Sequence, residues 1–443
     1  MIDVLPFRGL RYEVARVGDL SPIISPPYDL VAAEEEELYY HRSPYNVIRL
    51  EQGLVRAGNS PSDERYSRAA DTLHKWLSEG ILVRNGSPAF YLSSHEFEHL
   101  GRIRKRWGLT AKVRLEDWET GRIRPHELTM KEPTADRLQL LRSCQANISP
   151  IMGLFRDESG EFLSLVLQLA ASEPDCRVTD DWGVTHSLWL IRNQSHVTKI
   201  SSIFSEKVLY IADGHHRYQT ALNYRAERRR QPPSGSGDEP YNFVMMTLSD
   251  SEDPGLIMLS THRLVRGLEP QKLEQLEQCL YPLFHLEELP PSSSSLAETL
   301  EAWLRELEAR GRDNNAFGIY GLRNDRLILA TARNSSKLIQ MMPTGNSLVW
   351  KKLDVNVLHL IILSEILGVD SAHKARDCLD FTRDGLECIS AVNSGEYQLA
   401  FFLNPAPISS ILEIADAGER MPQKSTFFYP KMPTGLVIHP LWE

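Results

Sequence analysis

Residues 208–222 carry the sequence Val-Leu-Tyr-Ile-Ala-Asp-Gly-His-His-Arg-Tyr-Gln-Thr-Ala-Leu. Residues 208–212 form an apolar run of strand-forming types, and apolar residues return at helical spacing from Tyr218 onward. Gly214 separates the two patterns and permits a tight turn that a residue with a Cβ atom would resist. The segment therefore predicts a strand, a turn and a helix.

The turn in this segment concentrates polar side chains. His215, His216 and Arg217 follow Gly214 directly, at the start of the expected helix. Backbone N–H groups and the positive end of the helix dipole face that turn, and both favour an anion. Basic side chains are unfavourable beside the positive end of the helix dipole, so their presence at this turn needs another explanation. The pattern predicts an anion site, most simply for phosphate, with Asp213 as an adjacent catalytic carboxylate.

The composition is that of a globular protein. The 443 residues suffice for roughly two or three domains, with 42% hydrophobic and 24% charged residues. The net charge of −10 argues against a protein that coats nucleic acid. No apolar stretch approaches the roughly 20 residues that span a bilayer, and the N-terminus lacks a signal-peptide pattern. The five cysteines include no C-x-x-C pair. We expect a cytoplasmic protein without nucleic-acid or membrane partners; the oligomeric state stays open.

Helical and strand patterns mix along the whole chain and predict a mixed α/β fold. We expect a core domain over 1–265, a smaller α/β segment over 266–345, and a C-terminal segment over 346–443 that packs back on the core. Helices are expected at 33–42, 64–79, 134–145, 160–171, 217–231, 270–281, 296–310, 355–367 and 408–417, and strands at 46–51, 88–97, 107–116, 208–212, 241–249, 257–259, 316–320, 327–332 and 397–403.

A second polar cluster begins at His126 and Glu127 and leads into an expected helix that Thr134 could cap. Glu127 offers a carboxylate base or a metal ligand. Lys131 and Arg137 offer positive charge for phosphoryl oxygens. Taken alone, the same pattern also fits a polar loop before a capped helix.

A third cluster lies near the C-terminus, over residues 421–431. Lys424, Ser425 and Thr426 supply a cation and two hydroxyls, with Lys431 close behind. No glycine-rich loop precedes them, so this is not a Walker motif.

Two shorter elements add candidates. Asp29 ends a stiff Pro-Pro-Tyr-Asp turn, where capping of the following acidic helix is its expected role. His262 and Arg263 follow an apolar run, which places them at the end of an expected strand or on the surface. The H-E-x-x-H, G-x-S-x-G and G-x-G-x-x-G motifs are absent, which weakens zinc-protease, hydrolase and dinucleotide functions.

Together these motifs resemble an uncharacterised prokaryotic family, domain of unknown function 1015. The resemblance runs from Pro6-Phe7-Arg8-Gly9 to Gly435-Leu436-Val437. It is carried by Pro26-Pro27-Tyr28-Asp29, Asn46-Val47-Ile48-Arg49-Leu50, His126-Glu127-Leu128-Thr129, Asp136-Arg137, Asp213-Gly214-His215-His216-Arg217, Thr261-His262-Arg263 and Met421 to Lys431. The family has no settled activity to transfer, and Arg49 enters the candidate residues through it.

The Asp-Gly-His-His-Arg turn is also similar to the phosphate-binding turn of the ParB and sulfiredoxin-like superfamily. Its members include nucleotide-hydrolysing partition proteins, sulfiredoxins and kinases of free serine. The resemblance implies a ParB/sulfiredoxin-like core that holds nucleotide phosphates. The first family is associated with serine-biosynthesis genes, which implies a hydroxy-amino acid or its phosphate ester as substrate.

The leading hypothesis is an enzyme that moves a phosphoryl group to or from a small metabolite, such as serine or phosphoserine. The turn at Gly214 and His215 would hold a phosphate whose charge His216 and Arg217 compensate. The remaining roles are deprotonation of the attacking group by Glu127 and neutralisation of the transition state by Lys424 or Lys131.

Cofactors and alternatives follow from the same residues. A nucleotide such as ATP or ADP would bring Mg²⁺, for which Asp213 or Glu127 are the available ligands. We expect no haem, flavin, NAD or structural zinc. One alternative is a phosphatase with His215 or His216 as nucleophile. Another is a nucleotide-binding switch without small-molecule turnover.

Overall fold

The computed structural model describes residues 2–53, 63–230, 237–323, 326–369, 377–422 and 424–442. The chain forms two compact units. The first unit comprises residues 1–125, 129–257 and 430–443, and the second comprises 126–128 and 258–429. Both contain helices packed on sheets, which confirms the predicted mixed α/β class. Across the described ranges, no helix has both the length and the apolar character needed to cross a membrane.

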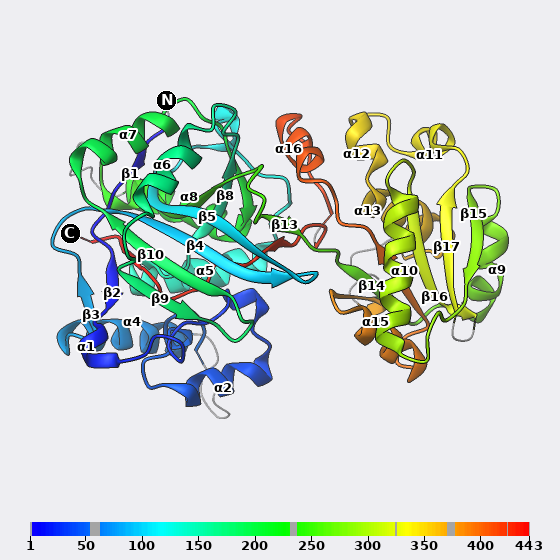
Figure 1. Ribbon diagram of the computed structural model, residues 1–443, viewed down its shortest axis with the longest axis horizontal. Helices are drawn as coiled ribbons and strands as arrows, with labels where there is room; N and C mark the ends of the chain where they lie inside the picture. Colours follow the sequence, from blue (N-terminus) through cyan, green and yellow to red (C-terminus); the bar gives the residue numbers. More distant parts are fainter. Residues whose placement is uncertain are drawn as a thin grey trace. The chain divides into compact units, whose positions relative to one another are not determined.

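The first unit is built on a large mixed sheet in the order β6-β11-β8-β12-β5-β4-β10-β9, with β1 beside β5 (Figure 1). Its strands are β1 (Val4–Leu5), β4 (Phe90–His99), β5 (Arg102–Arg114), β6 (Ile123–Arg124), β8 (Ile151–Phe155), β9 (Cys176–Thr179), β10 (Thr185–Ile191), β11 (Leu209–Asp213) and β12 (Phe243–Asp250). β11 runs parallel to β6 and antiparallel to β8. The predicted strand at 208–212 is thus part of the main sheet.

Helices cover this sheet and fix the position of its loops. The longer ones are α2 (Ala33–Arg42), α4 (Asp63–Ser78), α5 (Lys131–Cys144), α6 (Glu161–Leu169), α7 (Gln194–Phe204) and α8 (His215–Arg229). α8 packs against α5, and α5 packs against α4. Phe155, Phe162 and Phe204 meet edge to face in the core beneath α6 and α7, with ring centroids 4.8–5.7 Å apart.

The end of the chain returns to the first unit. The red C-terminal segment in Figure 1 runs through the unit that holds the blue N-terminal strands. There β21 (His439–Pro440) pairs with β7 (Ala146–Asn147), and Leu10 pairs with Ile438. β2 (Leu10–Tyr12) in turn pairs with β3 (Leu82–Arg84). The N-terminal and C-terminal segments therefore belong to the same compact unit.

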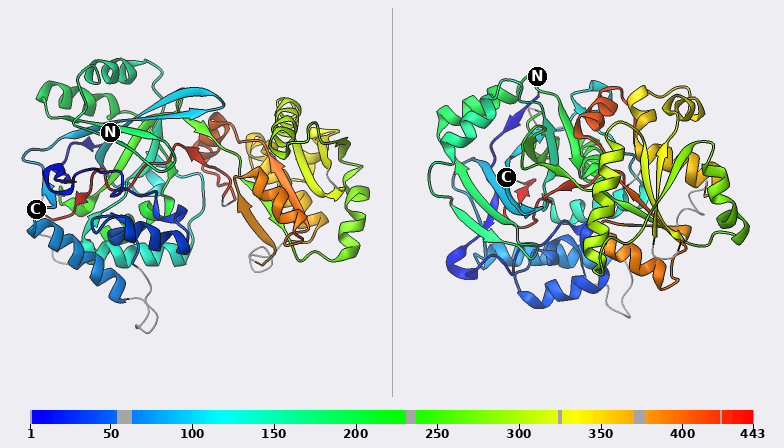
Figure 2. Two further views of the ribbon diagram at one scale, coloured as in Figure 1. Left: turned by 60° about the horizontal axis from the view of Figure 1, so that its bottom comes forward. Right: turned by 45° about the vertical axis from the view of Figure 1, so that its right-hand side comes forward.

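The second unit has an antiparallel sheet in the order β15-β17-β16-β19-β14-β18. Its strands are β14 (His262–Val265), β15 (Phe284–Leu289), β16 (Ala316–Arg323), β17 (Arg326–Ala332), β18 (Leu379–Thr382) and β19 (Leu399–Leu403). Figure 2 shows α10 (Leu296–Gly311) and α15 (Gly385–Asn393) against this sheet, where Trp303, Leu307 and Ile389 join its core. The unit also contains α9 (Pro270–Leu280), α11 (Ser335–Met341), α12 (Leu348–Lys352), α13 (Asp354–Val357), the π-helix η4 (Leu358–Ile366) and α16 (Ile408–Asp416).

The strand predicted at 46–51 is wrong, because these residues form the short helix α3 (Ile48–Glu51). Asn46 explains the difference. Its side-chain oxygen accepts the Ile48 N–H at 2.9 Å, and its amide group donates to the Pro22 carbonyl at 2.8 Å. Ile48 and Leu50 are fully buried and alternate with Arg49 and Glu51, so the segment has the apolar–polar alternation of a strand.

Asn46→Ala is expected to lower the free energy of unfolding by about 2 kcal/mol, because it leaves the buried Ile48 N–H and the Pro22 carbonyl without their side-chain partner. Urea denaturation measures the change. The control is Asn193→Ala, which removes the exposed cap of α7 and should lower stability by about 1 kcal/mol. An equal loss in the two variants would contradict this explanation of α3.

Candidate functional site

The strand–turn–helix at residues 208–222 forms as predicted in kind. β11 ends at Asp213, and α8 begins at His215, two residues earlier than expected. Gly214 lies in the left-handed region at φ 93°, and a Cβ atom there would come within 3.0 Å of the Arg217 side chain. No side chain of the described residues caps α8, so the positive end of its dipole faces the turn.

Two cations converge on the carboxylate at this turn. Arg217 donates to Asp213 Oδ2 at 2.6 Å, and Lys431 donates to Asp213 Oδ1 at 2.5 Å. The side chains are 11%, 15% and 6% exposed for Arg217, Asp213 and Lys431. Burial alone would raise the pKa of Asp213, but Lys431 and Arg217 hold it well below its ordinary value. This Asp213 cluster carries a net positive charge.

Asp213→Asn and Lys431→Met are expected to be non-additive in stability. At pH 7 the ion pair is intact, so each single change removes it and the double change loses little more. A double-mutant cycle from urea denaturation should give a coupling energy of about 1–2 kcal/mol. Additive losses would show that this pair contributes nothing to folding.

Arg217 is held at a second point, by donation to the Pro150 carbonyl at 2.6 Å. Its Nε is buried and has no hydrogen-bond partner among the residues that the structure describes. Burial lowers the pKa of Arg217, and Asp213 together with more distant acidic groups raises it above its ordinary value. The guanidinium is therefore a fixed cation with an unused donor.

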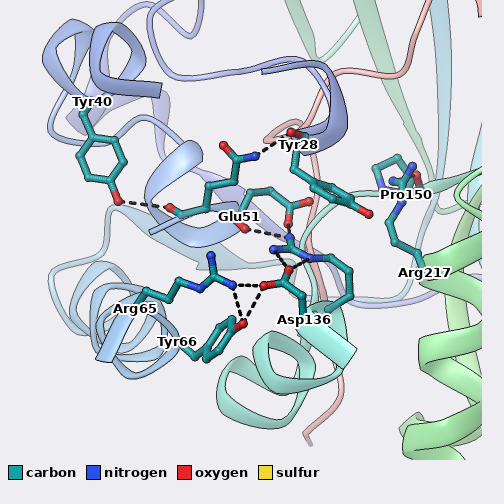
Figure 3. A network of polar contacts seen from close by, with 10 residues as sticks. Tyr28, Tyr40, Glu51, Arg65, Tyr66, Asp136, Pro150 and Arg217 are labelled. Atoms are coloured by element: carbon teal, nitrogen blue, oxygen red, sulfur yellow. Dashed lines mark hydrogen bonds and ion pairs between the residues drawn. The ribbon is translucent and has the colours of Figure 1, made fainter. Parts of the chain in front are cut away.

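A polar network from the N-terminal segment lies beside Arg217 (Figure 3). Arg137 on α5 donates to the Glu51 carbonyl at 2.8 Å and pairs with Asp136 at 2.5 Å. Its guanidinium lies 4.2 Å from the centroid of the Tyr28 ring. Tyr66 donates to Asp136 at 2.6 Å. The network fixes Glu51 and Arg137 in place.

Glu51 and Arg137 share a small cavity with Arg217. The cavity has a volume of about 50 Å³, and Ser149 and Thr220 also line it. The Glu51 side chain is 4% exposed, and its Oε1 is buried without a hydrogen-bond partner in the described part of the chain. A carboxylate residue and an arginine thus line the same cavity.

The histidine pair begins α8, directly after this turn. His216 Nε2 accepts the Met130 N–H at 2.9 Å, which ties α8 to the start of α5, and His215 is 5% exposed. Lys131 is exposed as the first residue of α5. Thr134 does not cap that helix: α5 begins three residues earlier, and Thr134 Oγ1 donates back to the Met130 carbonyl at 2.7 Å.

The second and third sequence clusters meet in the second unit. His126 Nε2 lies 3.0 Å from Thr426 Oγ1, across 300 positions of sequence. Glu127 is half-buried and forms a β-bridge with Met421. Lys424 is exposed, at φ 57°, and the adjacent Ser425 donates to the Pro422 carbonyl. Glu127 and Lys424 therefore belong to one compact unit and Arg217 to the other.

The shorter elements lie differently from the prediction. Asp29 is exposed in a 3₁₀ turn, and the N-cap of α2 is Ala32, so Asp29 does not cap that helix. Arg49 donates to the Tyr40 carbonyl at 2.6 Å. His262 and Arg263 follow the short strand β13 (Ile257–Met258), but they do not lie on the surface. They begin β14, between β18 and β19, and are 3% and 1% exposed.

Asp213 does not fit a protein-held Mg²⁺, because each of its carboxylate oxygens already accepts a hydrogen bond from a cation. In the part of the chain that the structure describes, no three or more His, Cys, Asp or Glu side chains are grouped to hold a metal ion.

Sequence reasoning missed Glu51, which ends a run that resembles a strand. A charged residue after Ile48 and Leu50 gives no sign of its partner, because Arg137 lies 86 positions away. The signal that was present is its position, because Glu51 directly follows the Asn46-Val47-Ile48-Arg49-Leu50 motif.

One protein-family model, described as protein of unknown function (DUF1015), matches residues 4–356. No protein of curated function matches the chain. Among solved structures, a conserved hypothetical protein from Pyrococcus furiosus is 11% identical with a TM-score of 0.34, over 75% of this chain and 95% of that one. A free serine kinase in complex with AMP is 11% identical with a TM-score of 0.34, over 74% and 92%. C-terminally truncated SbnI from Staphylococcus aureus is 11% identical with a TM-score of 0.33, over 75% and 87%. Because these similarities are so distant, the function has to be argued from the geometry of the site.

Proposed function

We propose, for a chain that belongs to the DUF1015 family of proteins of unknown function, an enzyme that transfers or hydrolyses a phosphoryl group on a small molecule. The observation that carries the proposal is the convergence of Arg217 and Lys431 at the uncapped start of α8. Lys431 lies 218 positions after Asp213, the carboxylate that it contacts.

A phosphate group matches the chemistry of this turn. The helix dipole and the backbone at the start of α8 favour a negative charge. Arg217 offers its unused Nε donor, and the net charge of the Asp213 cluster is positive. Charge-assisted hydrogen bonds to phosphate oxygens are among the strongest that proteins make.

Glu51 is the proposed general base, in place of Glu127. It lines the same cavity as Arg217, and its buried Oε1 has no hydrogen-bond partner among the described residues. In the proposed step, a hydroxyl oxygen of the acceptor attacks phosphorus while its proton passes to Glu51. The bond from phosphorus to the leaving oxygen breaks, and the leaving group departs with that electron pair. Arg217 and Lys431 offset the charge on the phosphoryl oxygens.

The hydrogen bonding of His216 argues against its Nε2 as the nucleophile that would form a phosphohistidine. Its Nε2 lone pair accepts the Met130 N–H, so that nitrogen is engaged in fixing α8 to α5. A nucleophilic histidine needs a ring nitrogen directed at phosphorus. His216 is therefore proposed as a positioning residue.

The proposed substrates are ATP or ADP with L-serine, or phosphoserine alone, as the resemblance of the turn implies. Phosphorus NMR of the full chain with each mixture and added Mg²⁺ tests this. The expected result is a new phosphomonoester signal in the first mixture or inorganic phosphate in the second. The absence of any product, with nucleotide signals that only broaden, would contradict an enzyme and favour a nucleotide-binding switch.

A further inference from the structure

The largest cavity described in the second unit has no place in the proposed reaction. Its volume is about 400 Å³, within the range of small-molecule sites. It lies beside β14 and β19 and the starts of α11, α13 and α16. The lining mixes apolar and polar residues, and its polar members include Arg263, Asn315, Ser335, Asp354, Ser410 and Ser425.

Arg263 is the unusual member of this lining, because its charge is buried without a counter-charge. The residue is 1% exposed. Its guanidinium contacts three neutral acceptors: the Thr261 carbonyl, the Lys424 carbonyl at 3.2 Å and His359 Nε2 at 3.4 Å. A guanidinium has five N–H donors, so two of them have no acceptor among the described residues.

Burial shifts the pKa of Arg263, and no carboxylate among the described residues offsets this shift. It lowers the pKa of Arg263 to about 9, and no acidic group of the described chain raises it again. The guanidinium is still protonated at neutral pH. A buried ion is unfavourable unless it is paired, so an oxyanion from solution would supply the missing charge.

The backbone next to Arg263 is also strained. Lys424 has φ 57°, a left-handed conformation that costs a residue with a side chain free energy. Its carbonyl is one of the acceptors that hold Arg263, and the next residue, Ser425, lines the cavity. Strain of this kind gathers at ligand clamps.

We infer that the second unit carries a separate binding site for a small oxyanion, a carboxylate or a phosphate, with Arg263 as its anchor. The buried guanidinium, its two unused donors and the cavity of about 400 Å³ that Arg263 lines are the observations behind this site. The site does not depend on the proposed reaction, because all its lining residues belong to the second unit.

Equilibrium dialysis of the full chain tests this inference, with radiolabelled inorganic phosphate and succinate as the two probes. The background is Arg217→Gln, which removes the anion site at α8, so failure of the proposed function leaves this test intact. We expect one equivalent of one probe per chain at millimolar concentration. The probe that binds distinguishes a phosphate ligand from a carboxylate ligand.

Two further variants in the same background locate the site. Arg263→Gln should weaken binding by about tenfold or more, because a charge-assisted contact is lost. Ser410→Phe should do the same by filling the cavity, and it decides the matter if Arg263→Gln fails to fold. Arg266→Gln is the matched control, since Arg266 already pairs with Asp380. Binding of neither probe, or binding unchanged by both Ser410→Phe and Arg263→Gln, would overturn the inference.

Discussion

Arg217→Ala is expected to lower phosphoryl transfer by about 100-fold or more. The change removes the donor proposed to face the phosphate, and loss of one such donor in an active site is typically this large. It also leaves Asp213 Oδ2 without the cation that now neutralises it, so the carboxylate repels the phosphate. Phosphorus NMR of product formation, together with the far-UV circular dichroism spectrum, measures the loss and checks the fold.

Arg225→Ala is the matched control for this prediction. Arg225 is also a buried arginine of α8, but it donates to the Leu115 carbonyl at 2.6 Å and pairs with Asp117 at 2.5 Å. The Arg225→Ala variant should be less stable than the wild type but should keep its turnover. Turnover within about threefold of wild type in Arg217→Ala would remove the basis for a phosphate site at α8.

The second large effect is on the pH dependence of stability, through Asp354. This residue begins α13, and its carboxylate accepts from the Asn315 amide at 2.6 Å. Burial is the main cause that raises its pKa to about 7, against hydrogen bonds that lower it. In the unfolded chain the pKa is about 3.9.

The sign follows from proton binding. Between about pH 4 and 7 the folded protein keeps a proton on Asp354 that the unfolded chain has released, so stability falls as pH rises through this window. The fall amounts to up to about 4 kcal/mol and ends above pH 7. Asp354→Asn should remove it from unfolding curves measured across the window, whereas the exposed Asp313→Asn should retain it. A wild-type stability that rises over this range would contradict the assignment.

Local patterns in the sequence predicted local structure well. The 208–222 segment forms a strand, a turn and a helix, and α10 fits the spacing of its leucines. The same patterns failed at Ile48 and Leu50, which alternate with charged residues as in a strand although they lie in a helix. A helix of four residues is too short for its periodicity to be distinguished from that of a strand.

Contacts between distant residues were beyond the sequence. The third cluster was expected to act together, but Thr426 meets His126 in the second unit while Lys431 meets Asp213 in the first. Glu51 joins Arg137 through a fold that no local pattern specifies. Single residues of the correct chemical type were therefore identified without their partners, and the catalytic assignments remain proposals.

The return of residues 430–443 to the first unit has a consequence for biosynthesis. Asp213 emerges from the ribosome 218 positions before Lys431, and the whole of 258–429 is made in between. The first unit therefore cannot finish folding as an independent N-terminal body, and its closing contacts have high contact order. Until then the carboxylate at the α8 turn lacks one of its two cations. The anion site is among the last features of the nascent chain to mature, after the second unit has been synthesised.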